Sequence, residues 1–253
     1  AGTEEKGQTF PGVGRPFGMT QWTSETRITE TKCVSPYYYN DKFITGFRGS
    51  RWMSGSCTQD YGSISVMPFT TDRFDTVNNS PVSKLNHRHE TSTPAWYCLL
   101  LDDFRIKAEM TGTVRCGFFR FSFRSKRGNY LQIRLNSDRG VGSLWFDQQQ
   151  KEIIGYNPVF RIYQGWGQPA GFSGWFVIRF DKPFLLVRNG KQEAILSFEG
   201  QKVIQVQIGT SFTGAAAARN NLDTEIKNWN FNRLCKESED EWDQTLGKVR
   251  VKG

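Results

Sequence analysis

Apolar and polar side chains alternate with a period of two through much of this chain, and this pattern restricts its fold more than any other feature. The alternation is clearest in residues 104–110, 114–123, 131–136, 176–180 and 204–208. Because successive side chains of a strand point to opposite faces, the pattern predicts antiparallel strands with one buried face. Residues 96–101 form a continuous apolar run, which indicates a further buried strand.

Turn-forming residues separate these segments. They lie at residues 102–103, 125–128, 138–140, 188–190 and 199–200, and Asn189-Gly190 is the strongest signal for a two-residue hairpin. No helical segment lies between the strands, which argues against a parallel sheet with crossover helices. The predicted fold is therefore all-β, a large antiparallel β-sandwich over residues 1–210, and the 20 Phe, 8 Tyr and 8 Trp side chains suit its inter-sheet layer.

After residue 210 the pattern becomes helical. Residues 215–226 predict one helix, residues 228–230 interrupt it, and Asn230 is expected to cap a second helix. An exposed Trp242 on an isolated helix would be unfavourable, so we expect this helix to pack on the sandwich or on another domain. Residues 211–253 are thus predicted to be a short helical linker, whose second helix places these residues on one face: Phe231, Leu234, Cys235, Ser238, Trp242 and Leu246.

Charge and cysteine content exclude several functional classes. The net charge is +8, but no run of five or more Lys or Arg and no nucleic-acid module occurs, so nucleic acid is not the expected partner. No stretch approaches the ~18 apolar residues of a membrane span. The two histidines and the absence of a CxxC motif give little material for a zinc site, and no metal ligand is assigned. The odd number of cysteines argues against a complete disulfide framework, whereas one or two disulfides or free thiols both remain open: Cys33, Cys57, Cys98, Cys116 and Cys235.

The glycine-rich segment at residues 46–62 is the candidate ligand site. It has neither a helical period nor strand alternation, which predicts an ordered loop between strands. It combines tryptophan with arginine and aspartate, and a sugar offers apolar faces for stacking and hydroxyls for hydrogen bonds to such groups. We therefore predict sugar contacts at the pocket rim from Trp22, Arg48, Arg51, Trp52, Asp60 and Glu90.

Some of these residues have an equally reasonable structural interpretation. Trp22 and Trp52 could fill the sandwich core, and Arg48 could hold the loop by pairing with Asp60. Inverting hydrolysis of a glycoside needs two carboxyl groups far enough apart to hold a water molecule. The sequence does not place Asp60 opposite Glu90, so no catalytic residue is assigned to this chain.

Several longer motifs together resemble one family. In order and spacing they are similar to the N-terminal domain of family 92 glycoside hydrolases, the exo-acting, calcium-dependent α-mannosidases. The resemblance covers nearly the whole chain. It rests on TFPGVGRPFGM (9–19), the YYYND-to-GF run (37–47), SGS and DYG (54–62), ISVMP (64–68), NHRHETSTPAWYCLLLDD (86–103), IKAEMTGTVRCGFFRFSF (106–123) and GAAAARNNLDTEI (214–226).

This resemblance implies a galactose-mutarotase-like supersandwich joined by helices to an (α/α)6 barrel. The barrel would follow residue 253 and carry the catalytic acid and base and the Ca²⁺ that contacts the sugar. The complete enzyme would remove terminal α-mannosides with inversion, with α-1,2-mannosidase-like specificity, in the degradation of N-glycans and other mannose-containing glycans. This chain would line the pocket, dock the catalytic barrel and be inactive alone. We expect a periplasmic or secreted protein.

Two other functions remain open on the sequence alone. A stand-alone carbohydrate-binding module would bind mannose or mannobiose without a partner domain. A purely structural domain would stabilise the barrel and tolerate replacement of the 46–62 segment by a neutral linker.

Overall fold

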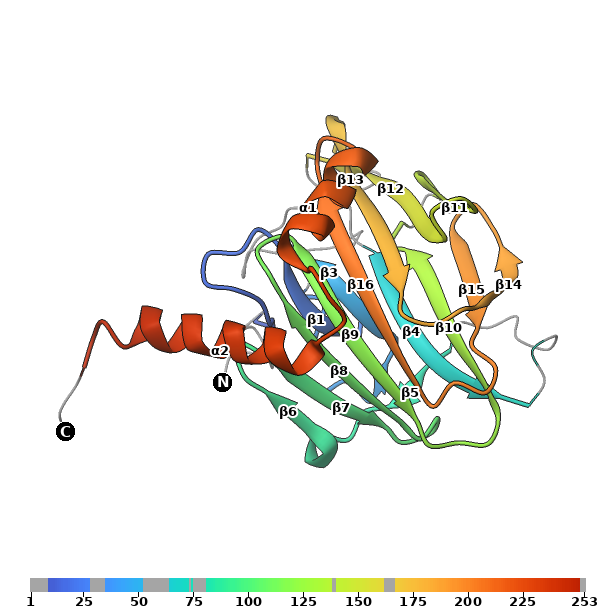
Figure 1. Cartoon of the computed structure of the whole chain (residues 1–253), viewed down its shortest axis with the longest axis horizontal. Coiled ribbons are helices and arrows are strands. Elements are labelled where there is room, and N and C mark those ends of the chain that lie inside the picture. The colour runs from blue at the N-terminus through green and yellow to red at the C-terminus, as the bar shows by residue number, and fades with distance from the viewer. Residues whose placement is uncertain are drawn as a thin grey trace.

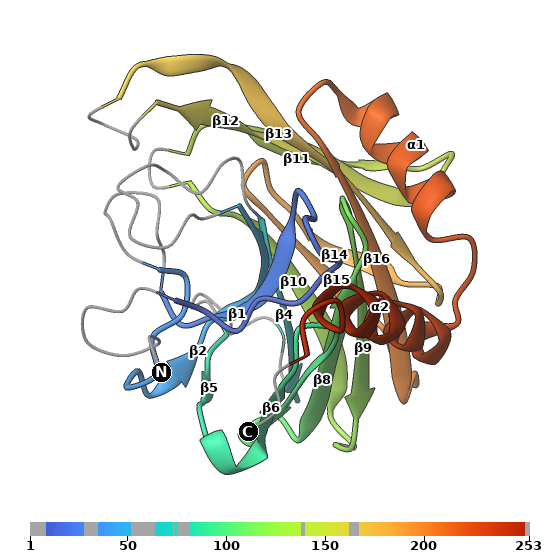
Figure 2. The same cartoon turned by 90° about the vertical axis from the view of Figure 1, so that its left-hand side faces the viewer.

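The computed structural model describes residues 9–27, 35–51, 64–72, 74, 81–137, 140–161 and 167–250. Two large antiparallel sheets stack on each other, and two helices lie over the outer face of one of them (Figure 1). Viewed from the side, both helices lie beyond β16 and β9, on the opposite side from β1 and β4 (Figure 2). The predicted all-β antiparallel sandwich with a short helical C-terminal segment is thus confirmed.

The smaller sheet has six strands. Their order across the sheet is β1 (Gln21–Glu25), β3 (Gly46–Ser50), β4 (Ile64–Thr71), β10 (Gly128–Leu135), β15 (Glu193–Ser197) and β14 (Leu185–Asn189).

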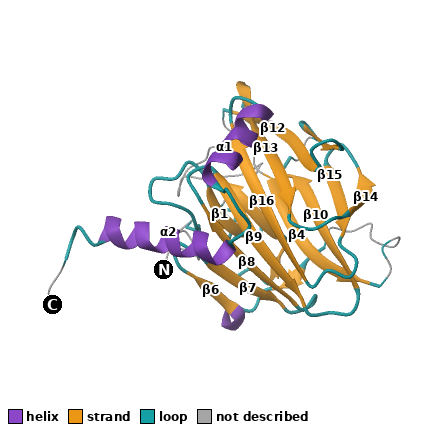
Figure 3. Ribbon diagram, viewed as in Figure 1, coloured by secondary structure: helices purple, strands orange, loops and turns teal. Residues whose placement is uncertain are grey.

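The larger sheet has eight strands (Figure 3), and the described residues also form a separate two-stranded ribbon. The sheet order is β11 (Ser143–Asp147), β12 (Glu152–Phe160), β13 (Pro169–Phe180), β16 (Val203–Ser211), β9 (Cys116–Phe123), β8 (Ile106–Gly112), β7 (Tyr97–Leu101) and β6 (Glu90–Ser92). The ribbon pairs β2 (Phe43–Ile44) with β5 (Ser83–Lys84), and the 3₁₀-helix η1 (His87–His89) precedes β6.

The predicted strand segments correspond to β7, β8, β9, β10, β13 and β16. The hairpin at Asn189-Gly190 also forms, between β14 and β15, but its loop has three residues. Asn189 pairs with Ala194, and the Gly190 N–H donates to the Glu193 carbonyl at 2.8 Å. A two-residue loop at Asn189-Gly190 would pair Arg188 with Lys191, but Arg188 pairs with Ile195, so the predicted turn was too short.

The segment at residues 46–62 departs from its prediction as a loop. Gly46–Ser50 is a buried strand, β3, paired with both β1 and β4. Its glycines are there for packing. A Cβ on Gly49 would lie 3.0 Å from the Trp22 ring, and one on Gly46 would lie 3.3 Å from the Ser65 Cβ. Residues 52–63 lie outside the described part of the chain.

The core lies between the sheets, but β9 is buried on both faces. Phe119 and Phe121 point into the inter-sheet core, where the rings stack at 6.0 Å. Phe118 points the other way, into a second cluster beneath the helices, and meets the Phe231 ring edge-on at 5.4 Å. The helices therefore cover an apolar outer face that would otherwise be exposed.

The two helices are α1 (Ala215–Glu225) and α2 (Phe231–Leu246). As predicted, the Asn230 side chain caps α2, accepting a hydrogen bond from the Arg233 N–H at 3.0 Å. The predicted apolar face is only partly covered, since Ser238 is buried whereas Leu246 is 60% exposed. Neither helix has the length and apolar composition of a membrane span.

Three of the five cysteines are described, and all three are free thiols: Cys98, Cys116 and Cys235. Burial raises the pKa of each thiol, that of Cys235 to about 11. These groups therefore remain largely protonated near neutral pH and are poor nucleophiles.

A charged cluster holds α2 against the sheet. The Glu109 carboxylate on β8 accepts hydrogen bonds from Arg120 at 2.8 and 2.9 Å and from Lys107 at 2.9 Å. The Arg120 guanidinium also donates to the Asn232 side chain at 2.8 Å and lies 4.4 Å from the centre of the Phe231 ring. Burial alone would raise the pKa of Glu109, but the hydrogen bonds from Arg120 and Lys107 outweigh burial and hold the pKa below its usual 4.5.

This cluster predicts a specific pH dependence. Because the folded pKa of Glu109 is lowered, its stabilising effect is complete above the unfolded value of about 4.5 and is lost as the pH falls through the folded pKa. The free-energy difference between the wild type and Glu109→Gln should therefore be largest near neutral pH and shrink in acid. Urea unfolding at a series of pH values measures it, and a constant difference at every pH would contradict the assignment.

Candidate functional site

The structure separates the six sequence-predicted sugar contacts. Trp52 and Asp60 lie outside the described residues, so their roles stay predictions. Arg48 and Arg51 come from β3 and its end, in the smaller sheet. Glu90 lies on β6, at the edge of the larger sheet.

Trp22 occupies the sandwich core. It is fully buried, meets Phe119 edge-on at 5.3 Å, and fits a slot whose walls are glycines of both sheets. A Cβ on Gly117 would lie 2.4 Å from the indole and one on Gly112 2.6 Å from it, so only glycine leaves room for the ring. Trp22 has no surface for a ligand to touch, and the structure supports the core alternative.

Arg48 is also fully buried, and its described partner is a residue that the sequence did not single out. Glu25, at the end of β1, is 0% exposed and accepts a hydrogen bond from the Arg48 guanidinium at 3.2 Å. Arg134 on β10 donates to the same carboxylate at 2.6 Å. A buried carboxylate needs such partners because water no longer solvates its charge.

Neutral side chains complete the shell around Glu25. Thr45 donates to it at 3.0 Å and Asn136 at 3.2 Å, and the Ser65 hydroxyl on β4 donates as well. Glu25 therefore joins β1, β3, β4 and β10. We assign Arg48 to this structural network and no longer to a sugar contact.

The Glu25 network can be tested by substitution. Glu25→Gln keeps the side-chain shape but removes the buried negative charge that accepts hydrogen bonds from Arg48 and Arg134, so we expect a loss of about 3–5 kcal/mol in the free energy of unfolding. Arg233→Ala is the matched control. It removes a surface ion pair between Arg233, which is 65% exposed, and Glu237, which is 42% exposed. The free energy of unfolding should therefore fall by less than about 1 kcal/mol. Equal losses for the two variants in urea unfolding would contradict the network's importance.

Arg51 follows β3 and contributes to a partly exposed aromatic patch. Its guanidinium lies 4.7 Å from the centre of the Phe212 ring, just after β16. Phe212 in turn meets Phe172 of β13 edge-on at 5.3 Å, and Phe172 is 43% exposed. We call Arg51, Phe172 and Phe212 the Arg51 patch. The exposed Phe172 ring can stack on the apolar face of a sugar, whereas Nε and Nη2 of Arg51 are buried and place its charge behind the rings.

The sequence pointed to Arg51 but missed both phenylalanines of the patch. They are 40 residues apart. They meet only because β13 pairs with β16, so no local pattern could have joined them.

Glu90 is held by neighbouring side chains. Its carboxylate accepts hydrogen bonds from the hydroxyls of Tyr97 at 2.6 Å and Tyr37 at 3.0 Å, and lies 2.6 Å from His87 Nδ1. Burial and the Glu90 charge raise the pKa of both tyrosines, so they remain hydrogen-bond donors. The Tyr39 ring stacks on His87 with centroids 3.9 Å apart and is 43% exposed. With both oxygens engaged, Glu90 suits a positioning role better than that of a general base.

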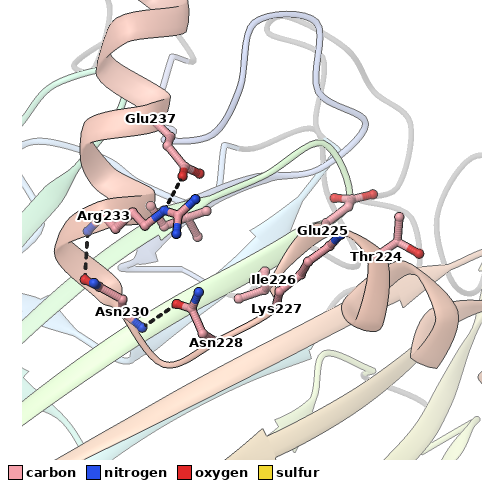
Figure 4. Close-up of a pocket in the computed structure, with 9 residues that line it drawn as sticks. Thr224, Glu225, Ile226, Lys227, Asn228, Asn230, Arg233 and Glu237 are labelled. Carbon is pink, nitrogen blue, oxygen red and sulfur yellow. Dashed lines mark hydrogen bonds and ion pairs between the residues drawn. The ribbon is translucent and has the colours of Figure 1, made fainter.

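A pocket of about 290 Å³ lies between the two helices (Figure 4). Arg233 pairs with Glu237 at 2.7 Å across one side, and the Asn230 N–H donates to the Asn228 side chain at 2.9 Å. None of the described residues that line this pocket is aromatic, so they offer no ring on which a sugar could stack. The lining residues are Thr224, Glu225, Ile226, Lys227, Asn228, Asn230, Arg233, Leu234 and Glu237.

The described part of the chain contains His, Cys, Asp and Glu side chains, which are the residue types that ligate metal ions. Among them, no group of three or more His, Cys, Asp or Glu side chains is arranged to hold a metal ion. Calcium prefers six to eight oxygen ligands, often from several carboxylates. The resemblance implies a calcium ion on the barrel that would follow residue 253, and so does not require one in this domain.

Comparison with known families identifies the chain. The model of the glycosyl hydrolase family 92 N-terminal domain matches residues 1–213. The chain belongs to this family. Comparison with curated protein sequences gives no match.

Solved structures of family 92 share this fold. An inverting mannosidase from Bacteroides thetaiotaomicron superposes with a TM-score of 0.82 at 21% identity, over 100% of this chain and 36% of the mannosidase. A second family 92 α-mannosidase from the same bacterium, in complex with mannoimidazole, gives 0.82 at 24% identity with the same coverage. A bacterial glucoamylase in complex with acarbose gives 0.54 at 10% identity, over 96% of this chain and 38% of that enzyme.

These identities establish the fold alone. The family 92 domain described here spans about a third of the length of the mannosidases it resembles. The family match places the domain in a glycoside hydrolase, and the helices α1 and α2 lie entirely beyond the matched residues.

Proposed function

We propose that this chain is the N-terminal domain of an exo-acting α-mannosidase that inverts the anomeric configuration. The observation that carries the proposal is the family match over residues 1–213, together with superposition of the entire chain on two family 92 mannosidases. The catalytic acid and base would lie on an (α/α)6 barrel that follows this domain, and the substrates would be glycans with terminal α-mannose, α-1,2-linked in the first instance.

Within this function the domain lines the rim of the sugar pocket. The Arg51 patch contains two aromatic rings and a guanidinium. Arg51 itself follows β3 and immediately precedes Trp52 in the sequence. Trp52 and Asp60 remain proposed contacts on the sequence argument. Glu90 orders the tyrosines and histidine around it, leaving the exposed Tyr39 as the group able to touch a glycan there.

We further propose that calcium is bound by the domain that follows and that the protein acts in the periplasm or outside the cell. The calcium is proposed from the family resemblance, which implies an ion that contacts the sugar and lies on the barrel that follows.

The activity is tested with the complete protein and with residues 1–253 alone. The complete protein should release mannose from α-1,2-mannobiose, and β-mannose should appear first in the NMR spectrum because inversion places the new hydroxyl on the opposite face. The chain alone should release none, and a calcium chelator should abolish the activity of the complete protein. Appearance of α-mannose first, or release by the chain alone, would refute the proposed mechanism.

The Arg51 patch is tested by removing its rings in the complete protein. Phe172→Ala and Phe212→Ala should each lower kcat/KM by about three- to tenfold, since one aromatic stacking contact contributes about 0.5–1.5 kcal/mol. Trp145→Ala is the matched control, because Trp145 is similarly exposed, at 40%, but lies on β11 at the edge of the sheet. Unchanged kcat/KM in both Phe variants would remove the patch from the pocket.

A further inference from the structure

The turn at residues 15–18 combines an uncommon backbone with a bulky side chain. The Gly18 N–H donates to the Arg15 carbonyl at 3.1 Å, Pro16 takes the second position, and Phe17 at the third has φ = +58°. This is the pattern of a type II turn, whose third position normally holds Gly or Asn because other side chains are strained at positive φ. Here the position holds phenylalanine.

Phe17 is also 95% exposed, more than any other large apolar side chain in the described part of the chain. Its neighbour Pro16 is buried, so the turn itself is packed and only the Phe17 ring projects into solvent. A strained backbone and an exposed aromatic ring are both unfavourable in this domain alone. Such a combination points to an interaction that the domain does not contain.

The segment that presents Phe17 is fixed on both sides. Arg15 donates to the Glu241 carboxylate at 2.6 Å and to the Glu237 carbonyl at 2.7 Å, both on α2. The Met19 N–H donates to the Val114 carbonyl at 2.8 Å, in the turn between β8 and β9. Phe17 therefore stands on a rigid base, which limits the entropy lost on binding.

A second contact ties the same segment to α2. The Gly14 carbonyl accepts hydrogen bonds from the Trp242 indole at 2.8 Å and from the Ser238 hydroxyl at 3.0 Å. The segment before β1 thus lies beside α2, whose later turns extend away from the sheets (Figure 1). The two elements that hold this segment also carry exposed apolar side chains. Val114, in the turn between β8 and β9, is 41% exposed, and Leu246, at the end of α2, is 60% exposed.

We propose that Phe17 inserts into an apolar pocket of the domain that follows α2 in the same polypeptide and fixes that domain on the sandwich. The proposal rests on the proposed function, which requires such a domain. The family 92 mannosidases on which this chain superposes extend well beyond it, since it covers 36% of each. The Phe17 segment is attached to the helix that would connect the two domains.

A tethered domain suits one projecting ring better than a separate molecule does. A stable complex between separate proteins needs about 800 Å² of buried surface on each partner, far more than one side chain supplies. A domain in the same chain is already present at a millimolar effective concentration, so one aromatic anchor with a few surrounding contacts can hold it.

The test uses the complete protein and three variants. Phe17→Gly suits the positive φ and so does not strain the sandwich, but it removes the ring. Phe17→Leu keeps an apolar side chain. Leu185→Ala is the control, because it removes another exposed apolar side chain, 65% exposed, from β14 at the far edge of the smaller sheet. Limited proteolysis of the segment after α2 and thermal unfolding report whether the two domains remain docked.

Phe17→Gly should be cleaved between the domains about tenfold faster than the wild type and should unfold in two separate transitions. The cleavage rate of Phe17→Leu should lie between those of the wild type and Phe17→Gly, and Leu185→Ala should match the wild type in both measurements. Wild-type cleavage and unfolding in Phe17→Gly would overturn the proposal, and a rise in KM without a change in either readout would assign Phe17 to the sugar instead. Since neither readout needs activity, a protein that lacks mannosidase activity would refute the proposed function without deciding this one.

Discussion

The larger sheet is covered on both faces, and most of the structure depends on this. The smaller sheet packs on one face, and α1 and α2 pack on the other, where Phe118 meets Phe231. An antiparallel sheet with only one covered face would expose Phe118 and its neighbours to water. Burial of this second face holds the helices on the sandwich, and α2 in turn holds the segment that carries Phe17.

The strand pattern made the sandwich predictable, whereas the role of the glycines was not. The period-two alternation located five strands correctly, the apolar run at 96–101 a sixth, and the Asn230 cap the helix α2, because each depends on local patterning. Residues 46–50 were expected to be a loop because of their glycines, yet Gly49 serves to admit the Trp22 ring. The need for glycine at position 49 comes from Trp22 on the neighbouring strand. Likewise, the placement of Trp22 in the core depends on glycines of other strands.

The candidate site was predictable only in part, for a related reason. Arg48 and Arg51 are three residues apart and look equivalent in sequence, but Arg48 is fully buried against Glu25, whereas Arg51 is half-buried and lies over Phe212. Neither partner lies within 20 residues of its arginine. Recognising the two roles therefore requires the pairing of β1 with β3 and of β13 with β16, which no local signal contains.

Glu25 has a consequence for how this domain could diversify. One carboxylate connects four neighbouring strands of the smaller sheet, and its partners are buried polar groups whose geometry tolerates little displacement. The connection from β3 to β4 begins and ends beside this fixed point. Substitutions in that connection therefore need not displace the strand ends, because Glu25 holds both strands through its own hydrogen bonds.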